Sequence, residues 1–221
     1  MKKQHCWPQG HWNWPIDVSH KHGVRCGEMI WIGGQVDLTP EGVVCNKGDL
    51  AIQTKNVVAN IEKVLAGLDC DLQDLVTLLC FYVNDGSVDE AAFLAMVGSH
   101  LPEGCRPTVN AVPVPWLAYD GMLVEIEAYA MRRENGERLP RTYAPEGIGH
   151  PLPKPFVQGL RAGKMIFVSA QYPLDLEADE RGQPATAEEA AMTTEWVRLD
   201  QVDQLIARGT VVDAKTIIGL L

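Results

Sequence analysis

A chain of 221 residues with 46% hydrophobic and 22% charged residues has the composition of a globular protein with one large domain or two small ones. Its formal net charge of −10 argues against nucleic-acid binding, because an acidic surface repels phosphate and no cluster of Lys and Arg offsets it. No apolar run approaches the length of a membrane span and the N-terminus lacks the apolar core of a signal peptide, so we expect a cytoplasmic protein that binds no membrane.

The spacing of cysteine and histidine predicts no metal centre. The six cysteines include no C-x-x-C pair, and we expect reduced thiols, several of them buried. His20 and His22 would share one face of a strand, but no carboxylate or third nitrogen stands near them in the sequence to complete a metal site. We therefore expect a protein that works without metal or organic cofactor.

The first 20 residues are predicted to form an irregular arm, because they contain Trp7-Pro8 and Trp14-Pro15 and show no hydrophobic period. Tryptophan side chains are too apolar to remain in water. We expect Trp7, Trp12 and Trp14 to pack over a pocket or a neighbouring subunit.

Residues 21–133 show the pattern of one complete α+β domain. The order β-β-α-β-α-β-β predicts a compact sheet with both helices on one face, and a capping box at Ser87 and Glu90 would start the second helix. A hairpin loop over residues 113–121 is expected to join the last two strands. The expected strands cover residues 24–26, 29–32, 75–83, 105–110 and 123–128, and the expected helices cover 52–68 and 87–100.

The chain then repeats itself after a polar linker over residues 134–152. Residues 22–35 match residues 158–171 at a constant offset of 136 positions (158 minus 22), so residues 153–221 are predicted to be a partial second copy of the domain. Residues 187–207 are helical in pattern and residues 214–221 resemble a strand. This copy includes no counterpart of the second helix, of Arg106 or of Glu125.

Three explanations of the partial copy remain open. The sequence is a fragment of a longer tandem protein, a second polypeptide completes the copy, or the copy is a degenerate dimerisation element. A partial copy leaves its last strand as an unpaired sheet edge. We favour one of the first two explanations, because the apolar residues 217–221 are expected to make a poor natural terminus.

The last two strands of the complete domain carry the residues best suited to chemistry. Arg106 enters the first of them, and Glu125 stands among aliphatic residues in the second. Arginine offers a planar fork of donors that fits a carboxylate, and a glutamate beside it can orient or deprotonate water. We expect the scaffold to bring the two together around a small carboxylate substrate; the alternative is a structural ion pair across the hairpin.

Glu127 lies two residues after Glu125, so both side chains should point the same way from a regular strand. We expect one of them to be catalytic and the other to be a buried structural partner, and we favour Glu125 as the catalytic residue. Two carboxylates this close should raise the pKa of one of them, which suits a general acid or base.

Gly-Gly-Gln after the first two strands, the amphipathic helix, the apolar third strand, Arg-Pro-Thr-Val and Val-Glu-Ile-Glu-Ala-Tyr-Ala occur in an order that resembles the Rid (YjgF-type) reactive-intermediate deaminases. The resemblance covers residues 20–132 in full and residues 156–221 as the front half of a second copy. It implies a chorismate-mutase-like α+β fold, usually a homotrimer with pockets between subunits, and hydrolysis of enamines or imines to ketoacids and ammonia. It also implies that Arg106 holds the substrate carboxylate, that Glu125 is associated with the attacking water, and that the backbone near Gly33 and Gly34 lines the pocket.

Some positions depart from the family's pattern. The Ser or Thr that usually precedes the glycine is Gly33 here, although the second copy keeps Ser169, and an aromatic position on the first strand is His20. Thr108 stands where the family often has cysteine, and the loop over residues 113–121 is longer than usual and aromatic. These departures leave room for a larger, aromatic or ring-cleavage-derived substrate. The expected substrate-binding residues are Gly33, Gly34, His20, Thr108 and Trp116.

The sequence thus predicts an imine or enamine deaminase. A lyase or ring-opening hydrolase of an aromatic or xenobiotic pathway and a non-catalytic module that binds carboxylate metabolites remain as alternatives. The expected partners are a small carboxylate substrate and further copies of the chain, in a trimer or pseudo-trimer with its site at an interface. A second chain that completes the second copy is also retained as a partner.

Overall fold

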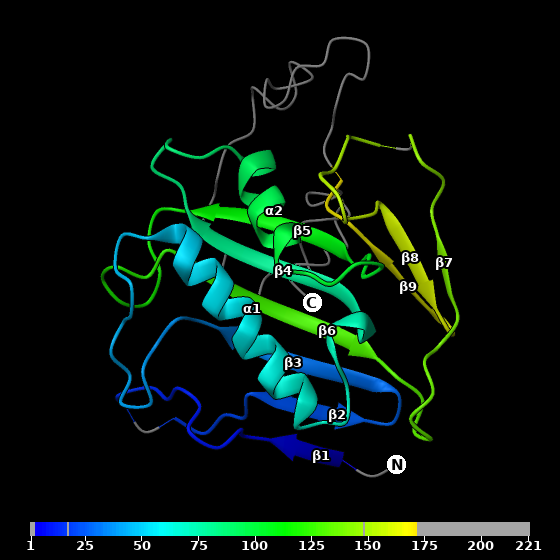
Figure 1. Cartoon of the computed structure of the whole chain (residues 1–221), viewed down its shortest axis with the longest axis horizontal. Coiled ribbons are helices and arrows are strands. Elements are labelled where there is room, and N and C mark those ends of the chain that lie inside the picture. The colour runs from blue at the N-terminus through cyan, green and yellow to red at the C-terminus, as the bar shows by residue number, and fades with distance from the viewer. Residues whose placement is uncertain (1–2, 17, 148, 172–221) are drawn as a thin grey trace, which may run out of the picture. The chain divides into compact units, whose positions relative to one another are not determined.

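Two β-sheets and two α-helices make up the part of the chain that the computed structural model describes, residues 3–16, 18–147 and 149–171 (Figure 1). The larger sheet has the strand order β1-β2-β3-β6-β4-β5, in which only β4 and β5 are parallel. The smaller sheet has the order β7-β8-β9 and is antiparallel. The strands are β1 (Lys3–Cys6), β2 (Gly23–Cys26), β3 (Met29–Gln35), β4 (Leu75–Val83), β5 (Thr108–Val114), β6 (Val124–Met131), β7 (Arg141–Tyr143), β8 (Gly159–Ala162) and β9 (Met165–Val168).

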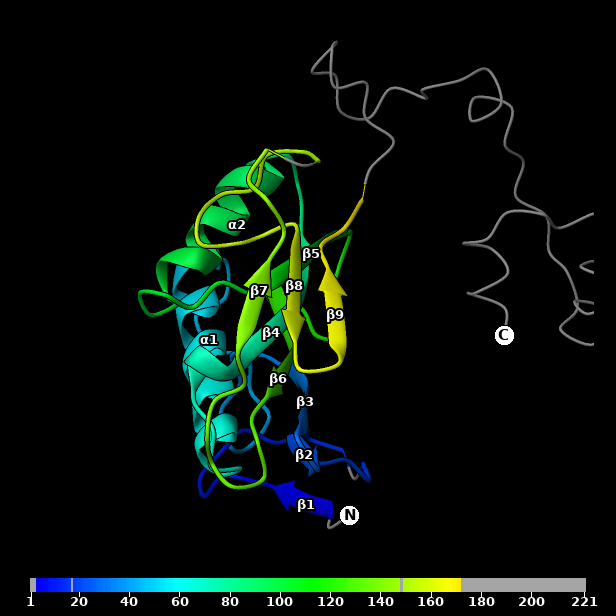
Figure 2. The same cartoon turned by 90° about the vertical axis from the view of Figure 1, so that its right-hand side faces the viewer.

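Both helices lie on the same face of the larger sheet, as the sequence predicted (Figure 2). The first is α1 (Leu50–Ala66), which begins where the Asp49 side chain accepts a hydrogen bond from the Ile52 amide at 2.9 Å. The second is α2 (Glu90–Ser99), and a short 3₁₀-helix, η1 (Leu72–Asp74), leads into β4. Within the described residues, neither helix combines the length and the apolar character needed to cross a membrane.

The core under the helices explains which side chains of β6 remain available for chemistry. Side chains alternate between the two faces of a strand, and Val124, Ile126 and Ala128 are buried in the cluster that includes the apolar face of α1. Glu125 and Glu127 therefore point away from the helices, to the opposite face of the sheet. The sequence correctly placed the two carboxylates on one side of this strand.

The smaller sheet packs against one end of that opposite face. Val76 of β4 and Met131 of β6 share an apolar cluster with residues that follow the complete domain in sequence. The described part of the second copy contributes strands β8 and β9 to the smaller sheet. The other buried members of the cluster are Leu139, Val157, Leu160 and Ala162.

The predicted hairpin between the last two strands of the domain is wrong. β4 lies between β5 and β6, pairing with β5 in parallel and with β6 in antiparallel register. The reason is the α2 crossover: a strand that follows a strand and a helix returns parallel and adjacent to the first strand, which places β5 on one side of β4 and leaves the other side to β6. The loop over residues 113–121 therefore spans the width of β4.

Three further expectations differ from the structure. The N-terminal arm contains β1, which pairs with β2 as an edge strand, and the predicted linker contains β7, which pairs with β8. Such short edge strands carry too few residues to show a period. Helix α2 is capped by Asp89, which accepts from the Ala92 amide at 2.7 Å, and not by Ser87. The predicted helix over residues 187–207 and strand over 214–221 lie outside the described residues.

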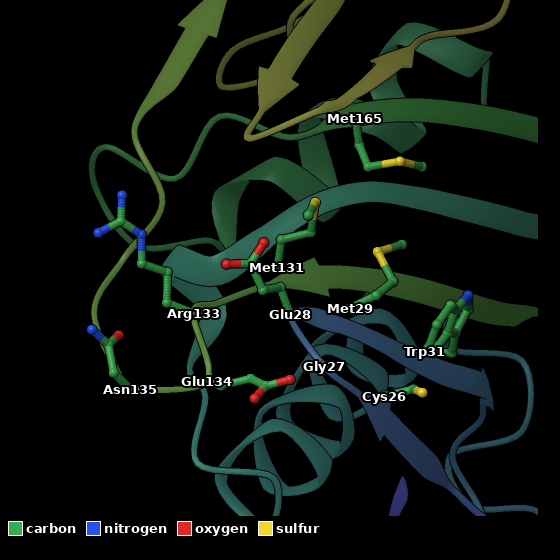
Figure 3. Close-up of a pocket in the computed structure, with 10 residues that line it drawn as sticks. All are labelled: Cys26, Gly27, Glu28, Met29, Trp31, Met131, Arg133, Glu134, Asn135 and Met165. Carbon is green, nitrogen blue, oxygen red and sulfur yellow. The ribbon is translucent and has the colours of Figure 1, made fainter. Parts of the chain in front are cut away.

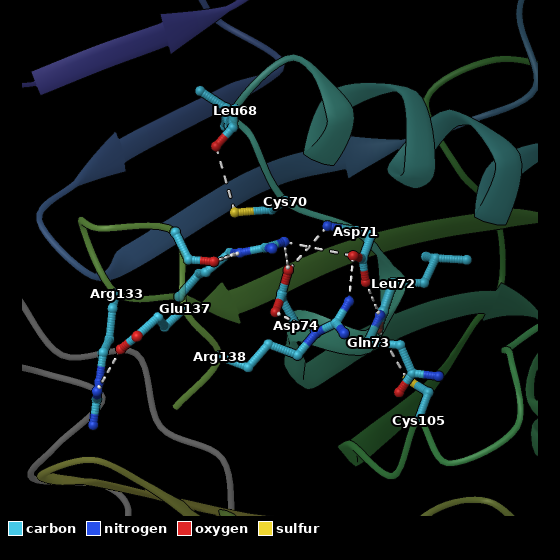
Figure 4. A network of polar contacts seen from close by, with 12 residues as sticks. Leu68, Cys70, Asp71, Leu72, Gln73, Asp74, Cys105, Arg133, Glu137 and Arg138 are labelled. Atoms are coloured by element: carbon cyan, nitrogen blue, oxygen red, sulfur yellow. Dashed lines mark hydrogen bonds and ion pairs between the residues drawn. The ribbon is translucent and has the colours of Figure 1, made fainter. Parts of the chain in front are cut away.

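A network of ion pairs ties η1 to the chain that leaves β6 (Figure 4). The fully buried Asp74 accepts from Arg132 Nη1 at 2.9 Å and from Arg138 Nε at 3.3 Å. Asp71 bonds Arg138 Nη2 as well, and its backbone amide donates to Asp74 at 3.0 Å. The start of β4 and the exit of β6 are thereby fixed together.

Candidate functional site

Glu125 faces a bulge in the neighbouring strand. Ile32 of β3 pairs with Ala128, whereas Gln35 pairs with Ile126, so β3 holds one extra residue at Gly33-Gly34. A Cβ atom at Gly34 would overlap the Oε1 atom of Glu125. Glycine at this position leaves the Glu125 carboxylate the space that a side chain would otherwise take.

The environment of Glu125 favours its protonated form. Burial raises the pKa of this carboxyl above its ordinary value, and the negative charge of Glu127 on the same face raises it further. A carboxyl whose pKa lies nearer neutrality exchanges protons more readily with a reacting group at neutral pH. The pKa of one of the two neighbouring carboxylates is therefore raised, at Glu125, and its role as a general acid or base stays a prediction.

Gln35 organises the bulge and connects it to the N-terminal arm. Its amide nitrogen donates to the carbonyls of Gly33 at 2.9 Å and Gly34 at 3.4 Å. Its amide oxygen accepts from His11 Nε2 at 2.8 Å and Trp12 Nε1 at 3.1 Å. The sequence reasoning assigned no role to Gln35, although the repeated Gly-Gly-Gln and Ser-Ala-Gln of the two copies was the signal for it.

The arm's histidines and tryptophans form a cluster beside this bulge. The ring centroids of His20 and His22 lie 5.1 Å apart, and Trp7 lies 4.9 Å from His20. Burial, followed by the charges of His11 and His20, lowers the pKa of His22 to about 4. Among the described residues, no three His, Cys, Asp or Glu side chains are arranged to hold a metal ion.

His20 lies in this aromatic cluster, in ring contact with Trp7, Trp12 and His22, and its role in substrate binding stays a prediction. The Gly33 amide donates to the His22 carbonyl at 3.0 Å, which places the strand end next to the bulge. Trp12 is buried against Val36 and Met122 of its own chain. At least this tryptophan therefore packs within the chain.

Arg106 lies just before β5, with its guanidinium carbon 4.7 Å from the centre of the Tyr143 ring. Arg106 Nη2 is 3.9 Å from Glu146 Oε1, and the two side chains are 40% and 94% exposed. A long, exposed ion pair of this kind is weak, so a carboxylate from solution can replace Glu146. The sequence reasoning did not anticipate Tyr143, which lies in the predicted linker.

The structure does not bring Arg106 and Glu125 together within one chain. Thr108 is level with Thr77 of β4, whereas Glu125 is level with Phe81 of the same strand. Arg106 precedes Thr108 by two positions, so about six residues, or roughly 20 Å along the strand, separate it from Glu125. The alternative of a structural ion pair across a hairpin is therefore wrong, and so is the expectation that the scaffold of a single chain brings Arg106 and Glu125 together.

Thr108 and Trp116 occupy different surroundings from those of Glu125. The Thr108 hydroxyl donates to the Val76 carbonyl at 3.1 Å and is fully buried, so it holds β5 to β4. Trp116 is 77% exposed in the loop over residues 113–121. Tyr119 of that loop contacts Trp14 of the arm at 5.6 Å between ring centroids.

A cavity of about 720 Å³ lies on the sheet face away from the helices (Figure 3). Its apolar wall consists of Trp31 and three methionines, Met29, Met131 and Met165, and its rim includes Glu28 and Glu134. A second cavity of about 440 Å³ lies around Arg25 and Asp69. Neither of these two cavities is lined by Arg106 or Glu125.

Comparison with known proteins finds relatives of the first domain. Residues 17–132 match the family model described as endoribonuclease L-PSP. A RutC family protein of Pyrococcus abyssi is 31% identical over 113 residues, which cover 51% of this chain and 86% of that protein. The human 2-iminobutanoate/2-iminopropanoate deaminase is 25% identical over 115 residues, which cover 51% of this chain and 80% of that enzyme.

Solved structures share the fold at lower identity. The yeast protein YEO7 is 22% identical, with a TM-score of 0.52, and the match covers 60% of this chain and all of that one. The Yersinia pestis Rid protein YyfA is 21% identical, with a TM-score of 0.51, and the match covers 59% of this chain and all of that one. The predicted α+β fold is thus confirmed, and the chain belongs to the endoribonuclease L-PSP family, which includes the RutC and Rid proteins.

Proposed function

We propose that this protein hydrolyses imine or enamine carboxylates to ketoacids and ammonia. The observation that carries the proposal is the Glu125 carboxylate, which is held over Gly34 with its pKa raised by burial. The human, rat and bovine relatives named 2-iminobutanoate/2-iminopropanoate deaminase support the reaction class. RNA cleavage is not part of the proposal, because a chain with a net charge of −10 repels a phosphate backbone.

In the proposed reaction, Arg106 binds the substrate carboxylate through its planar fork of donors. Deprotonated Glu125 takes a proton from water as the water oxygen attacks the imine carbon, which becomes tetrahedral. Glu125 passes that proton to the nitrogen, which gives a carbinolamine with a hydroxyl and an amino group on the same carbon. The hydroxyl proton is then transferred to the amino nitrogen, the carbon–nitrogen bond breaks, and ammonia leaves as the ketoacid carbonyl forms. One water is consumed for each ammonia released, and the chemistry needs no metal or organic cofactor.

We further propose that the two residues meet at an interface between copies of the chain. About six residue positions of β4 separate their levels within one chain, which is too far for one small substrate to contact both. The resemblance to Rid proteins implies a trimer with pockets between subunits, and such an assembly supplies Arg106 and Glu125 from different copies.

The test is ammonia release from an imine generated in situ, with Arg106→Ala, Glu125→Gln and a mixture of both variants. Each variant alone is expected to lose nearly all activity. A mixture refolded together at equal concentrations should regain about a quarter of the wild-type rate, because about one interface in four then holds both intact residues. Arg161→Ala, an exposed arginine of β8, is the matched control.

Equal ammonia release by wild type and Arg106→Ala would refute the deaminase assignment. A mixture that stays inactive while wild type is active would instead refute the shared interface.

A non-catalytic module that binds carboxylate metabolites is the second candidate. The separation of Arg106 from Glu125 favours it, because a single chain presents the arginine without a neighbouring water activator. Tight binding of 2-oxobutanoate without turnover of the corresponding imine would support this candidate over the deaminase.

A further inference from the structure

The outer edge of β5 is covered by the second copy of the domain. β5 is the last strand of the larger sheet, so the backbone groups that face away from β4 need other partners. The Val157 amide donates to the Pro107 carbonyl at 3.2 Å, and the Ala170 amide donates to the Val109 carbonyl at 3.3 Å. The Val109 amide donates to Ser169 Oγ at 2.9 Å. The second copy therefore holds the strand that follows Arg106.

The segment that covers β5 has the same internal hydrogen bonds as the bulge that faces Glu125. Gln171 Nε2 donates to the carbonyls of Ser169 at 2.9 Å and Ala170 at 3.3 Å, just as Gln35 Nε2 donates to those of Gly33 and Gly34. The Ser169 amide donates to the Gln158 carbonyl at 3.0 Å, and the Gly33 amide donates to the His22 carbonyl at the same distance. These equivalent bonds support the internal repeat.

Ser169 differs from its counterpart Gly33 by a hydroxyl that is fully used. The side chain is 3% exposed, its oxygen accepts from the Val109 amide, and its proton is donated to the Val157 carbonyl at 2.7 Å. Such a group cannot bind a ligand as well, so its effect is on the position of the strand. Loss of the hydroxyl would leave a buried amide without its acceptor.

The chain between the two copies completes the surroundings of Arg106. Tyr143 of β7 lies under the guanidinium, and Glu146 forms a long ion pair with it. A ring face restricts the guanidinium to a plane and leaves its edge donors available to a planar carboxylate.

We propose that the second copy completes the carboxylate-binding half of the site within one chain, with Ser169 as a positioning residue for Arg106. This inference rests on the proposed role of Arg106. Ser169 and Ala170 fix the edge of β5, Tyr143 orients the guanidinium, and a small monocarboxylate replaces Glu146. Binding of the carboxylate needs no residue from a second molecule, whereas turnover takes Glu125 from one.

The experiment uses the full chain and 2-oxobutanoate as the probe. Binding is followed by the NMR signal of the Arg106 Nε–H group, and the amide exchange rate of Val109 is measured in parallel. Ser169→Ala is expected to weaken binding about tenfold and to speed exchange at Val109, because the buried amide loses its acceptor. Ser169→Thr keeps the hydroxyl and should restore both properties. Ser99→Ala is the control, because it removes an exposed hydroxyl that donates to the Met96 carbonyl within α2.

The wild-type Kd is also measured at a protein concentration where sedimentation shows monomers and at one where it shows assemblies, and the two values should agree. Equal Kd values for wild type and Ser169→Ala, a Kd that requires assembly, or no response of the Arg106 signal would each overturn the proposal. A chain that binds in this manner but releases no ammonia retains the proposal and loses the deaminase assignment. If Ser169→Ala binds 2-oxobutanoate as wild type does and wild type releases ammonia, the proposal about Ser169 is refuted and the deaminase assignment is retained.

Discussion

Single residues decide how the Glu125 carboxylate is presented. Gly33 and Gly34 are neighbours in one bulge, but only Gly34 faces the carboxylate; a Cβ at Gly33 would meet only the carbonyl oxygens of Lys21 at 3.8 Å and His22 at 4.0 Å. These are ordinary contacts. The two glycines therefore form a matched pair in which the same added methyl group has different consequences.

Gly34→Ala is expected to lower ammonia release by about tenfold or more, because the methyl group displaces the carboxylate from its position over the bulge. The melting temperature should change little, since the obstructing atom is the end of a flexible side chain. Gly33→Ala is the control and should retain activity. Equal activity of the two variants would contradict the assigned position of Glu125.

Glu127 influences Glu125 through charge, which gives a test by pH. Glu127→Gln removes the like charge that raises the pKa of Glu125, while the larger effect of burial remains. If deprotonated Glu125 is the base, activity rises with pH through its pKa, so the acid limb of kcat/KM should move to lower pH in Glu127→Gln. Glu28→Gln is the control: it removes an exposed carboxylate from the turn between β2 and β3 and should leave the acid limb of kcat/KM unchanged. A limb that moves to higher pH would exclude Glu125 as the base.

At the scale of elements, the junction between η1, β4 and the exit of β6 depends on a buried charge. Asp74 has a fully buried carboxylate between Arg132 and Arg138. Removing one partner of a buried network leaves the other charges desolvated without compensation.

Asp74→Asn is expected to lower the free energy of unfolding by about 3 kcal/mol, measured by urea denaturation. Asp120→Asn is the matched control, because the Asp120 carboxylate is fully exposed in its 3.4 Å pair with Lys47 and its loss should leave the denaturation midpoint unchanged. Similar midpoints for the two variants would mean that the network contributes nothing to stability.

Local sequence patterns predicted the main helices and strands well, but they predicted poorly which strands are neighbours in the sheet. Helix α1 and strand β4 were predicted from period and apolar content, and the shared face of Glu125 and Glu127 followed from the pleat of a strand. The order of β4, β5 and β6 was missed because a nine-residue connection also fits a hairpin. The distance from Arg106 to Glu125 depends on that order, so sequence spacing could not supply it.

At the scale of the whole molecule, the arm's attachment makes stability depend on pH. His22 donates from Nε2 to the Trp12 carbonyl at 3.0 Å, and its other nitrogen faces the Gln35 amide group at 3.5 Å. A proton on that second nitrogen would face another donor. Burial, followed by the charges of His11 and His20, holds His22 neutral in the folded chain down to a pKa of about 4, below the ordinary value of 6.5.

Because unfolded His22 binds a proton below pH 6.5 and folded His22 does so only near pH 4, the free energy of unfolding should fall as pH decreases through this window. The decrease from this residue is on the order of 3 kcal/mol, and none arises above pH 6.5. Melting temperatures of wild type and His22→Gln between pH 7 and 4 test this, with exposed His5→Gln as the control. Parallel curves for all three proteins would show that His22 does not couple the arm to pH.

The order of motifs along the whole chain predicted more than local periodicity did, but it did not predict how the two copies pack. The order of motifs predicted the α+β class and the family, both of which the comparisons confirm. It could not predict that the second copy covers β5, because the hydrogen bond between the Val109 amide and Ser169 Oγ joins residues 60 positions apart. Edge pairing of this kind follows from three-dimensional position and has no sequence period.

Ala170 stands in the second copy where Gly34 stands in the first. A glutamate brought to Ala170 as Glu125 is brought to Gly34 would collide with the methyl group. The two segments therefore differ at this position: Gly34 leaves space for an acid and Ala170 does not, although a glutamine follows both and bonds the two carbonyls before it. A glutamate added to the second segment could take the position that Glu125 takes over Gly34 only if Ala170 were also replaced by glycine.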